Sequence, residues 1–173
     1  KVGVIFFSNK IEKFIPPKKG KTHILRIIRE LIHCTPNQNG TDINTVLQYL
    51  NNVIKKRSVV FILSDFFSTP FDDALRIVKR KHDVVALQIL DKQEETLPLL
   101  GIVKIFDNET QQMKWIDTND VQTQNSYREK HQSKIKSLKE LFKKTGVDIT
   151  TLFTHEDYVK PLQNLFRKRE ARR

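Results

Sequence analysis

Two polar positions in this sequence could hold a metal ion. Thr41 lies in Gly40-Thr41-Asp42 before an amphipathic stretch, and Asp65 follows the apolar run Val59–Leu63. Because such a β-branched run is typical of a strand buried on both faces, it predicts a central strand of a parallel sheet that ends at Asp65. Ligands of open α/β sheets bind at this edge, and Mg²⁺ prefers oxygen ligands. We therefore expect Thr41 and Asp65 to lie near one metal-binding edge.

A structural role explains the same residues without a ligand. Thr41 or Asp42 could be the N-cap of the helix expected from residue 43, since Thr and Asp are both common there. Asp65 could likewise cap the turn after its strand. The sequence alone leaves the metal-binding and capping interpretations open.

A second pair of acidic strand ends supports a rival, catalytic interpretation. Asp91 ends another apolar run, with Glu94 and Glu95 close by, and Asp65 and Asp91 could together hold Mg²⁺ for phosphoryl-transfer or nuclease-type hydrolysis. However, no basic or nucleophilic residue stands at a recognisable spacing from them. Gly20-Lys21-Thr22 is not a phosphate-binding loop, because that motif requires glycine at position 15, where this chain has Ile15.

The strongly basic composition supports a third interpretation, a nucleic-acid-binding domain. The chain has 31 Lys and Arg residues against 20 Asp and Glu residues, a formal net charge of +11. The basic clusters fall at the ends of predicted helices, where cations offset the helix dipole: Lys55–Arg57, Lys79–Lys81, Lys143–Lys144 and Arg167–Arg169. Aromatic residues do not interleave with them as a base-stacking platform requires. Phe66 and Phe67, beside Asp65, are instead predicted to form an apolar rim for a docking partner.

Strand and helix periodicities alternate along the chain and predict one α/β domain over residues 1–173 with a parallel sheet. Strands are expected at 2–7, 12–15, 59–63, 84–90 and 147–153, and helices near 24–32, 43–56, 71–78, 121–145 and 158–166. The first two strands form a hairpin stopped by Pro16 and Pro17. A second hairpin, 102–106 with 113–116 and a turn at 107–110, is inserted at a sheet edge. No apolar run approaches the ~20 residues of a membrane span.

Several ordered segments together resemble one protein family. They are VGVIFFSNKIEKFIPPKKG, NGTDINTVLQYL, SVVFILSDFF, KHDVVALQILD, LPLLGIV and KWIDT. They resemble the bacterial domain-of-unknown-function family fifty-eight, which is similar to von Willebrand factor A domains. The resemblance implies a Rossmannoid three-layer α/β sandwich, mostly parallel, with an antiparallel edge hairpin. It also implies a metal-ion-dependent adhesion site, in which Thr41 and Asp65 match the second and third metal-binding segments.

The chain departs from that family at its start. It has no Asp-x-Ser-x-Ser motif, and Lys1 falls where the second strand of the family would begin, so we expect the first, central strand to be absent from this chain. The two strand edges left open would then pair directly, or another chain or an upstream segment would fill the gap, giving a rearranged, assisted or swapped sheet. Thr41 and Asp65 alone should bind Mg²⁺ weakly or not at all, whereas the full-length protein could bind it.

The function that the resemblance implies is a non-enzymatic protein–protein interaction module. Its expected partner is a MoxR-type AAA+ ATPase, to which such a domain would recruit or present a client. Because proteins of this family commonly carry upstream membrane helices, we expect a cytoplasmic protein, or one at the cytoplasmic face of the inner membrane. The single cysteine, Cys34, fits a reducing compartment.

Overall fold

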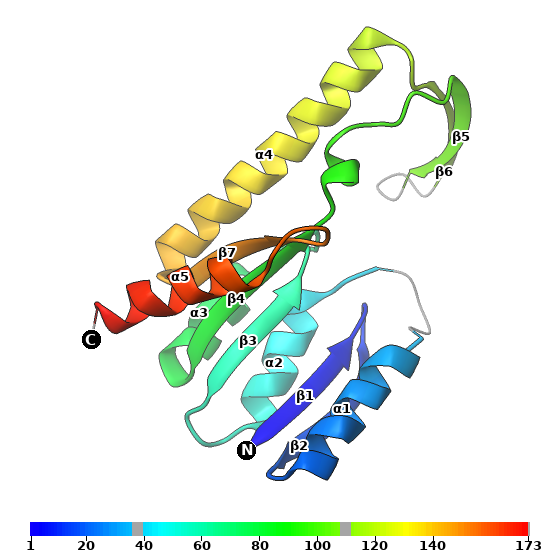
Figure 1. Ribbon diagram of the computed structural model, residues 1–173. Helices are drawn as coiled ribbons and strands as arrows, with labels where there is room; N and C mark the ends of the chain where they lie inside the picture. Colours follow the sequence, from blue (N-terminus) through cyan, green and yellow to red (C-terminus); the bar gives the residue numbers. More distant parts are fainter. Residues whose placement is uncertain (36–39, 108–111, 173) are drawn as a thin grey trace. The chain divides into compact units, whose positions relative to one another are not determined.

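The computed structural model describes residues 1–35, 40–107 and 112–172 (Figure 1). It divides into two compact units. The first consists of Lys1–Ile62 with Phe66–Val85, and the second of Leu63–Asp65 with Ala86–Arg173.

The first unit opens with an antiparallel hairpin of β1 (Val2–Phe7) and β2 (Ile11–Lys18). The predicted stop at Pro16 and Pro17 is wrong, because β2 runs through both prolines. Among the described residues β2 pairs with β1 alone, and an edge strand tolerates residues that lack an N–H. The strands approach closely at Gly3, where a Cβ atom would lie 2.9 Å from the carbonyl oxygen of Ile15 and from Pro17.

Three helices complete the first unit. They are α1 (Lys21–His33), α2 (Ile43–Val53) and α3 (Asp72–Lys81). Helix α2 packs against α3, and both helices carry fully buried side chains, such as Leu47 in α2 and Leu75 in α3. The end of α2 lies earlier than the predicted residue 56, because the chain turns extended at Ile54. Lys81 at the end of α3 donates a hydrogen bond to the Asn51 carbonyl oxygen (2.9 Å), which satisfies one acceptor of the last turn of α2.

A parallel three-stranded sheet contains β3 (Val59–Ser64), β4 (Asp83–Leu90) and β7 (Asp148–Phe153) in the order β3-β4-β7. Strand β4 is buried on both faces, as its apolar run predicts. The prediction that β3 is a central strand buried on both faces is wrong. Val59 and Leu63 are 57% and 53% exposed, whereas Val60 and Ile62 are buried, because one face of β3 is not covered by the described residues. Strand β3 is also at the edge of this sheet, with β4 as its neighbour. Local hydrophobicity alone could not reveal that β3 pairs with β4 alone among the described residues.

The pairing partners of β1 and β3 test one part of the expected rearrangement. Strand β1 pairs with β2 and β3 pairs with β4, so the described residues do not pair β1 directly with β3. Filling of the gap by another segment or chain stays a prediction. The predicted arrangement is confirmed: an α/β structure with a parallel sheet and antiparallel hairpins.

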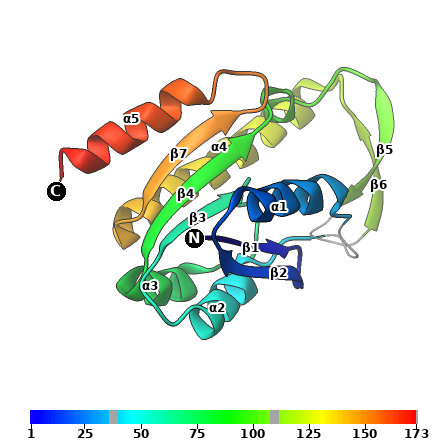
Figure 2. The same ribbon diagram turned by 60° about the horizontal axis from the view of Figure 1, so that its bottom comes forward.

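The second unit carries the inserted hairpin and two helices. Strands β5 (Ile102–Asp107) and β6 (Gln112–Asp117) form the predicted hairpin, whose turn lies mostly outside the described residues. Its predicted position at a sheet edge is wrong, because among the described residues β5 and β6 pair only with each other. Helix α4 (Val121–Thr145) ends at Gly146, a left-handed C-cap with φ 64°, as predicted. Helix α5 (Val159–Glu170) follows β7, and both α4 and α5 contact β7 (Figure 2).

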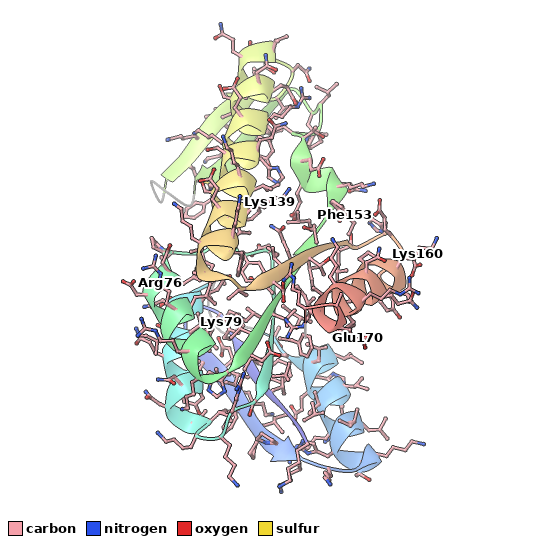
Figure 3. The ribbon with its side chains drawn as sticks, turned by 90° about the vertical axis from the view of Figure 1, so that its left-hand side faces the viewer. Arg76, Lys79, Lys139, Phe153, Lys160 and Glu170 are labelled. Carbon is pink, nitrogen blue, oxygen red and sulfur yellow. The ribbon has the colours of Figure 1, made fainter. Side chains whose placement is uncertain are left out.

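Basic residues gather in the last turns of the helices. The predicted clusters Lys79–Lys81, Lys143–Lys144 and Arg167–Arg169 lie in the last turns of α3, α4 and α5. The cluster Lys55–Arg57 lies beyond the end of α2, contrary to expectation. Figure 3 shows Arg76 on α3 and Lys160 on α5, both exposed. No helix among the described residues is long and apolar enough to cross a lipid bilayer.

Candidate functional site

Three loops of the first unit are joined by hydrogen bonds. The Asp42 N–H donates to the Ser8 carbonyl oxygen (2.9 Å), so the loop after β1 is tied to the start of α2. The Ser68 hydroxyl donates to the Thr41 carbonyl oxygen (2.9 Å) and accepts from the Ile43 N–H (3.1 Å). We call Ser8, Thr41, Asp42 and Ser68 the loop cluster. One serine hydroxyl therefore fixes the segment after β3 against the first turn of α2.

Asp42 is the N-cap of α2, which confirms the capping interpretation for this residue. Its carboxylate accepts from the Thr45 N–H (3.1 Å) and the Thr45 hydroxyl (2.6 Å), and the Thr69 hydroxyl lies 3.4 Å away. Burial by itself would raise the pKa of the Asp42 carboxyl, but these hydrogen bonds, with the Asn44 N–H, lower it overall. A carboxylate with these donors around it stabilises the helix start.

Asp65 belongs to the second unit, where its backbone is anchored from β4. The Gln88 side-chain amide donates to the Asp65 carbonyl oxygen (3.4 Å), and the Thr151 hydroxyl donates to the Gln88 amide oxygen (3.0 Å). Gln88 is only 1% exposed. The sequence does not predict this role of Gln88 directly. A single glutamine inside the apolar run of β4 nevertheless indicates a buried amide that needs hydrogen-bond partners.

The carboxylate of Asp65 also accepts a hydrogen bond from the Ser64 hydroxyl (3.2 Å). The next residue, Phe66, takes a left-handed backbone conformation with φ 64°, which is unusual for a bulky side chain. Its side chain is 4% exposed and packs 6.2 Å from the ring of Phe71, centroid to centroid. The prediction of Phe66 in an apolar rim is therefore wrong, because this turn directs the ring into the core.

Asp91, the second acid of the rival catalytic pair, makes local contacts. Its carboxylate accepts from the Gln93 N–H (2.9 Å) and caps the 3-10 turn η1 (Lys92–Glu95). His155 Nε2 lies 3.7 Å from its other oxygen. In the part of the chain that the structure describes, no three Asp, Glu, His or Cys side chains gather as a metal site would require. The carboxylate of Asp91 thus supports a turn.

The two predicted metal residues provide one hydroxyl and one carboxylate. Thr41 belongs to the first unit and Asp65 to the second, and Thr41 is held through its backbone carbonyl. Mg²⁺ takes about six oxygen ligands in near-octahedral geometry and usually keeps several waters. These two residues do not fit such a site by themselves, so an ion here would need ligands from elsewhere.

A solved structure of another protein shows a similar fold. The crystal structure of conserved hypothetical protein BatB from Bacteroides thetaiotaomicron matches with a TM-score of 0.56 and 11% identity, over 98% of this chain and 78% of that chain. At that identity the match establishes the fold alone. The chain is thus an α/β domain of the von Willebrand A-like class.

Sequence comparison then gives the family. The family model described as "Protein of unknown function DUF58" matches residues 1–137, and the chain belongs to this family. Uncharacterized protein MAV169 of Mycobacterium avium is 24% identical over 158 residues, covering 90% of this chain and 93% of that protein. Uncharacterized protein Rv1480 of Mycobacterium tuberculosis is 25% identical over 115 residues, which is 64% of this chain but 36% of that longer relative.

Proposed function

We propose that this chain is a non-enzymatic protein–protein interaction module that engages its partner at the carboxyl ends of its strands. The observation that carries this proposal is the loop cluster, in which the Ser68 hydroxyl holds the Thr41 carbonyl and the Ile43 N–H. Fixed loops lose little conformational entropy when a partner binds. The acids near these loops are engaged in capping, as at Asp42, which favours recognition over acid–base chemistry.

The partner that we propose is a MoxR-type AAA+ ATPase, on the ground of the family resemblance. In the full-length protein, Thr41 and Asp65 would contribute to a Mg²⁺ site together with ligands from outside this chain. A carboxylate of the partner would complete the coordination of the ion. The metal would then join two proteins, and we propose that this occurs in the cytoplasm or at the cytoplasmic face of the inner membrane.

Calorimetric titration with Mg²⁺ and Mn²⁺ tests the metal part of the proposal. We expect saturable binding by the full-length natural protein and little or none by residues 1–173 alone. Asp65→Ala should abolish binding in the full-length protein, and Asp91→Ala, the matched loss of a carboxylate at another strand end, should leave it unchanged. Binding that survives Asp65→Ala but not Asp91→Ala would contradict the proposal and favour the Mg²⁺-dependent hydrolase.

A nucleic-acid-binding role makes a different prediction. The basic clusters in the last turns of α3, α4 and α5 are explained by the helix dipole. Lys81, at the end of α3, is also engaged by the neighbouring helix, because its ammonium group donates to the carbonyl oxygen of Asn51 in α2 (2.9 Å). A nucleic-acid binder would instead show affinity for DNA or RNA that falls steeply with salt, which filter binding at two salt concentrations would detect.

A further inference from the structure

The inserted hairpin of the second unit has two chemically distinct faces. Side chains alternate along each strand, and the register pairs Lys104 with Trp115 and Ile105 with Lys114. Ile105 and Ile116 line a groove together with Tyr127 of α4, so we call the face of the hairpin that carries them the inner face. Every second residue of each strand points to the opposite face, which we call the outer face. It consists of three cross-strand pairs: Ile102 with Asp117, Lys104 with Trp115, and Phe106 with Met113.

The base of the hairpin is held firmly by hydrogen bonds. Thr118 is 1% exposed, and its hydroxyl donates to the Gly101 carbonyl oxygen and accepts from the Leu100 N–H, both at 2.9 Å. The Gln124 amide of α4 donates to the carbonyl oxygens of Thr118 (2.7 Å) and Leu97 (2.8 Å). These contacts fix the hairpin to the start of α4, so its outer face is presented in one orientation relative to that helix.

The outer face is apolar and accessible. Ile102 is 70% exposed, Trp115 68%, Met113 59% and Phe106 50%. Solitary exposed apolar residues are common on protein surfaces, but a contiguous set on one side of a short hairpin marks an interaction surface. Trp, Met and Phe are also enriched at the centres of protein interfaces. The composition and rigid support together indicate a docking face.

Charge indicates which kind of partner fits. Lys104 lies in the middle of the outer face with its ammonium nitrogen 6.0 Å from the centre of the Trp115 ring. Asp117, at one end of the face, accepts a hydrogen bond from the Asn119 N–H (2.9 Å) at the hairpin base. A ligand that covers the face must therefore accommodate the central cation of Lys104, and a carboxylate does so best.

Two other occupants fit less well. A second copy related by a two-fold axis through the central pair would bring two Lys104 ammonium groups together, and both copies carry a net charge of +11. An anionic membrane would place a continuous layer of negative charge over the whole outer face, including the Asp117 carboxylate at its end. A protein segment can instead place one carboxylate at Lys104 and apolar side chains over the rest of the face.

We propose that the outer face of the β5–β6 hairpin binds a protein segment that presents a carboxylate among apolar side chains, with the carboxylate paired to Lys104. This surface shares no residue with the loop cluster and goes beyond the function proposed above. The apolar side chains of the segment cover Trp115, Phe106 and Met113. The excess of positive charge over the whole chain speeds the approach of an acidic partner.

Selection from a phage-displayed random peptide library on the full chain tests this proposal. We expect enriched peptides to combine Asp or Glu with aromatic or aliphatic residues. Each selected peptide is then synthesised and titrated while tryptophan fluorescence is recorded, because Trp115 is the single tryptophan of the chain and lies on the outer face. A blue shift on binding is expected, since the peptide removes water from the ring.

Matched variants assign the binding to the central cation. Lys104→Glu should weaken peptide affinity at least tenfold, and a peptide with lysine in place of its acid should regain affinity for that variant. Lys114→Glu makes the same charge change on the other face and should alter affinity less than twofold. Asp65→Ala should have no effect, so that failure at this surface and failure of the strand-end proposal are told apart.

Four results would overturn the proposal. They are enrichment of no peptides, enrichment of peptides without an acidic residue, equal losses for Lys104→Glu and Lys114→Glu, and retained affinity of Lys104→Glu. A fluorescence shift with phosphatidylglycerol vesicles alone would assign the face to lipid. A shift on concentrating the protein without peptide would assign it to self-association. Circular dichroism of each variant confirms that the fold is kept.

Discussion

Replacing Asp42 with alanine removes the N-cap of α2 and weakens the connection of that helix to the following loops. The carboxylate accepts two hydrogen bonds from Thr45, at 3.1 and 2.6 Å, and a longer one from Thr69 at 3.4 Å. Loss of an N-cap side chain costs about 0.5–2 kcal/mol. Because the Thr45 N–H also loses its partner at a half-buried site, we expect a loss of about 1–2 kcal/mol in the free energy of unfolding.

The stabilisation by Asp42 should depend on pH in a defined direction. The pKa of Asp42 is lowered in the folded state from its ordinary 3.8, so its contribution is fully present above that value and is lost as the pH falls through the folded-state pKa. Urea unfolding followed by circular dichroism should show a large difference between wild type and Asp42→Ala at pH 7. That difference should shrink below about pH 3.8.

Asp42→Ser serves as the matched control, because serine is also a good N-cap and should keep most of the stability. Faster amide exchange at Thr45 in Asp42→Ala, but not in Asp42→Ser, would locate the effect at the helix start. The reasoning is refuted if Asp42→Ala unfolds at the same urea concentration as wild type, or if serine is as damaging as alanine.

Three further perturbations follow from individual contacts. His82 is 2% exposed, and its burial, with a smaller effect of the nearby Lys81 charge, lowers its pKa from 6.5. Because the unfolded state then binds more protons, the free energy of unfolding should fall as the pH drops below about 6.5. Urea unfolding should show this pH dependence in the wild type and a flatter one in His82→Leu. Gln124→Ala removes two hydrogen bonds from the base of the β5–β6 hairpin, so amide exchange at Leu100 and Thr118 should accelerate, whereas no change there would contradict the clamp. The Asp148 carboxylate accepts hydrogen bonds from Arg169 and Arg172, both at 2.6 Å. Asp148→Asn should lower the free energy of unfolding by about 1–2 kcal/mol, which thermal unfolding would measure. Asp157→Asn, at an exposed carboxylate, is the control.

Elements with strong local signals could be predicted from the sequence. The long helix near 121–145 and its glycine C-cap were predicted with the bounds that α4 has, because its periodic apolar positions and Gly146 are local features. The inserted hairpin was also found, since its two strands alternate and a polar segment lies between them. These elements depend little on distant parts of the chain.

Errors arose where distant neighbours decide the outcome. The apolar run of β3 resembles a strand buried on both faces, but Val59 and Leu63 are exposed because the described residues cover one face of β3 and leave the other open. The run of β2 through Pro16 and Pro17 likewise depends on its edge position. In both cases the residue types correctly predict a strand, but they do not determine which strands and helices pack beside it.

At the candidate site, too, residue types predict local roles, whereas the contacts between distant segments become visible only in the structure. Thr41 and Asp42 were both plausible N-caps by residue type, and only the backbone conformation assigns the role to Asp42. The contacts of Ser68 with Thr41 and of Gln88 with Asp65 join segments more than 20 residues apart, so no local pattern could reveal them. The assignment of Thr41 and Asp65 to a metal site stays a prediction.

Binding between the full-length natural protein and the MoxR-type ATPase of the same organism tests the central claim most directly. Affinity would be measured by calorimetry in Mg²⁺ for wild type, Asp65→Ala and Asp91→Ala, with phosphoester hydrolysis assayed on the same samples. We predict that wild type and Asp91→Ala bind with similar affinity, that Asp65→Ala loses binding, and that none hydrolyses substrate. Turnover by wild type that disappears in Asp91→Ala, with no ATPase binding by any form, would contradict the account.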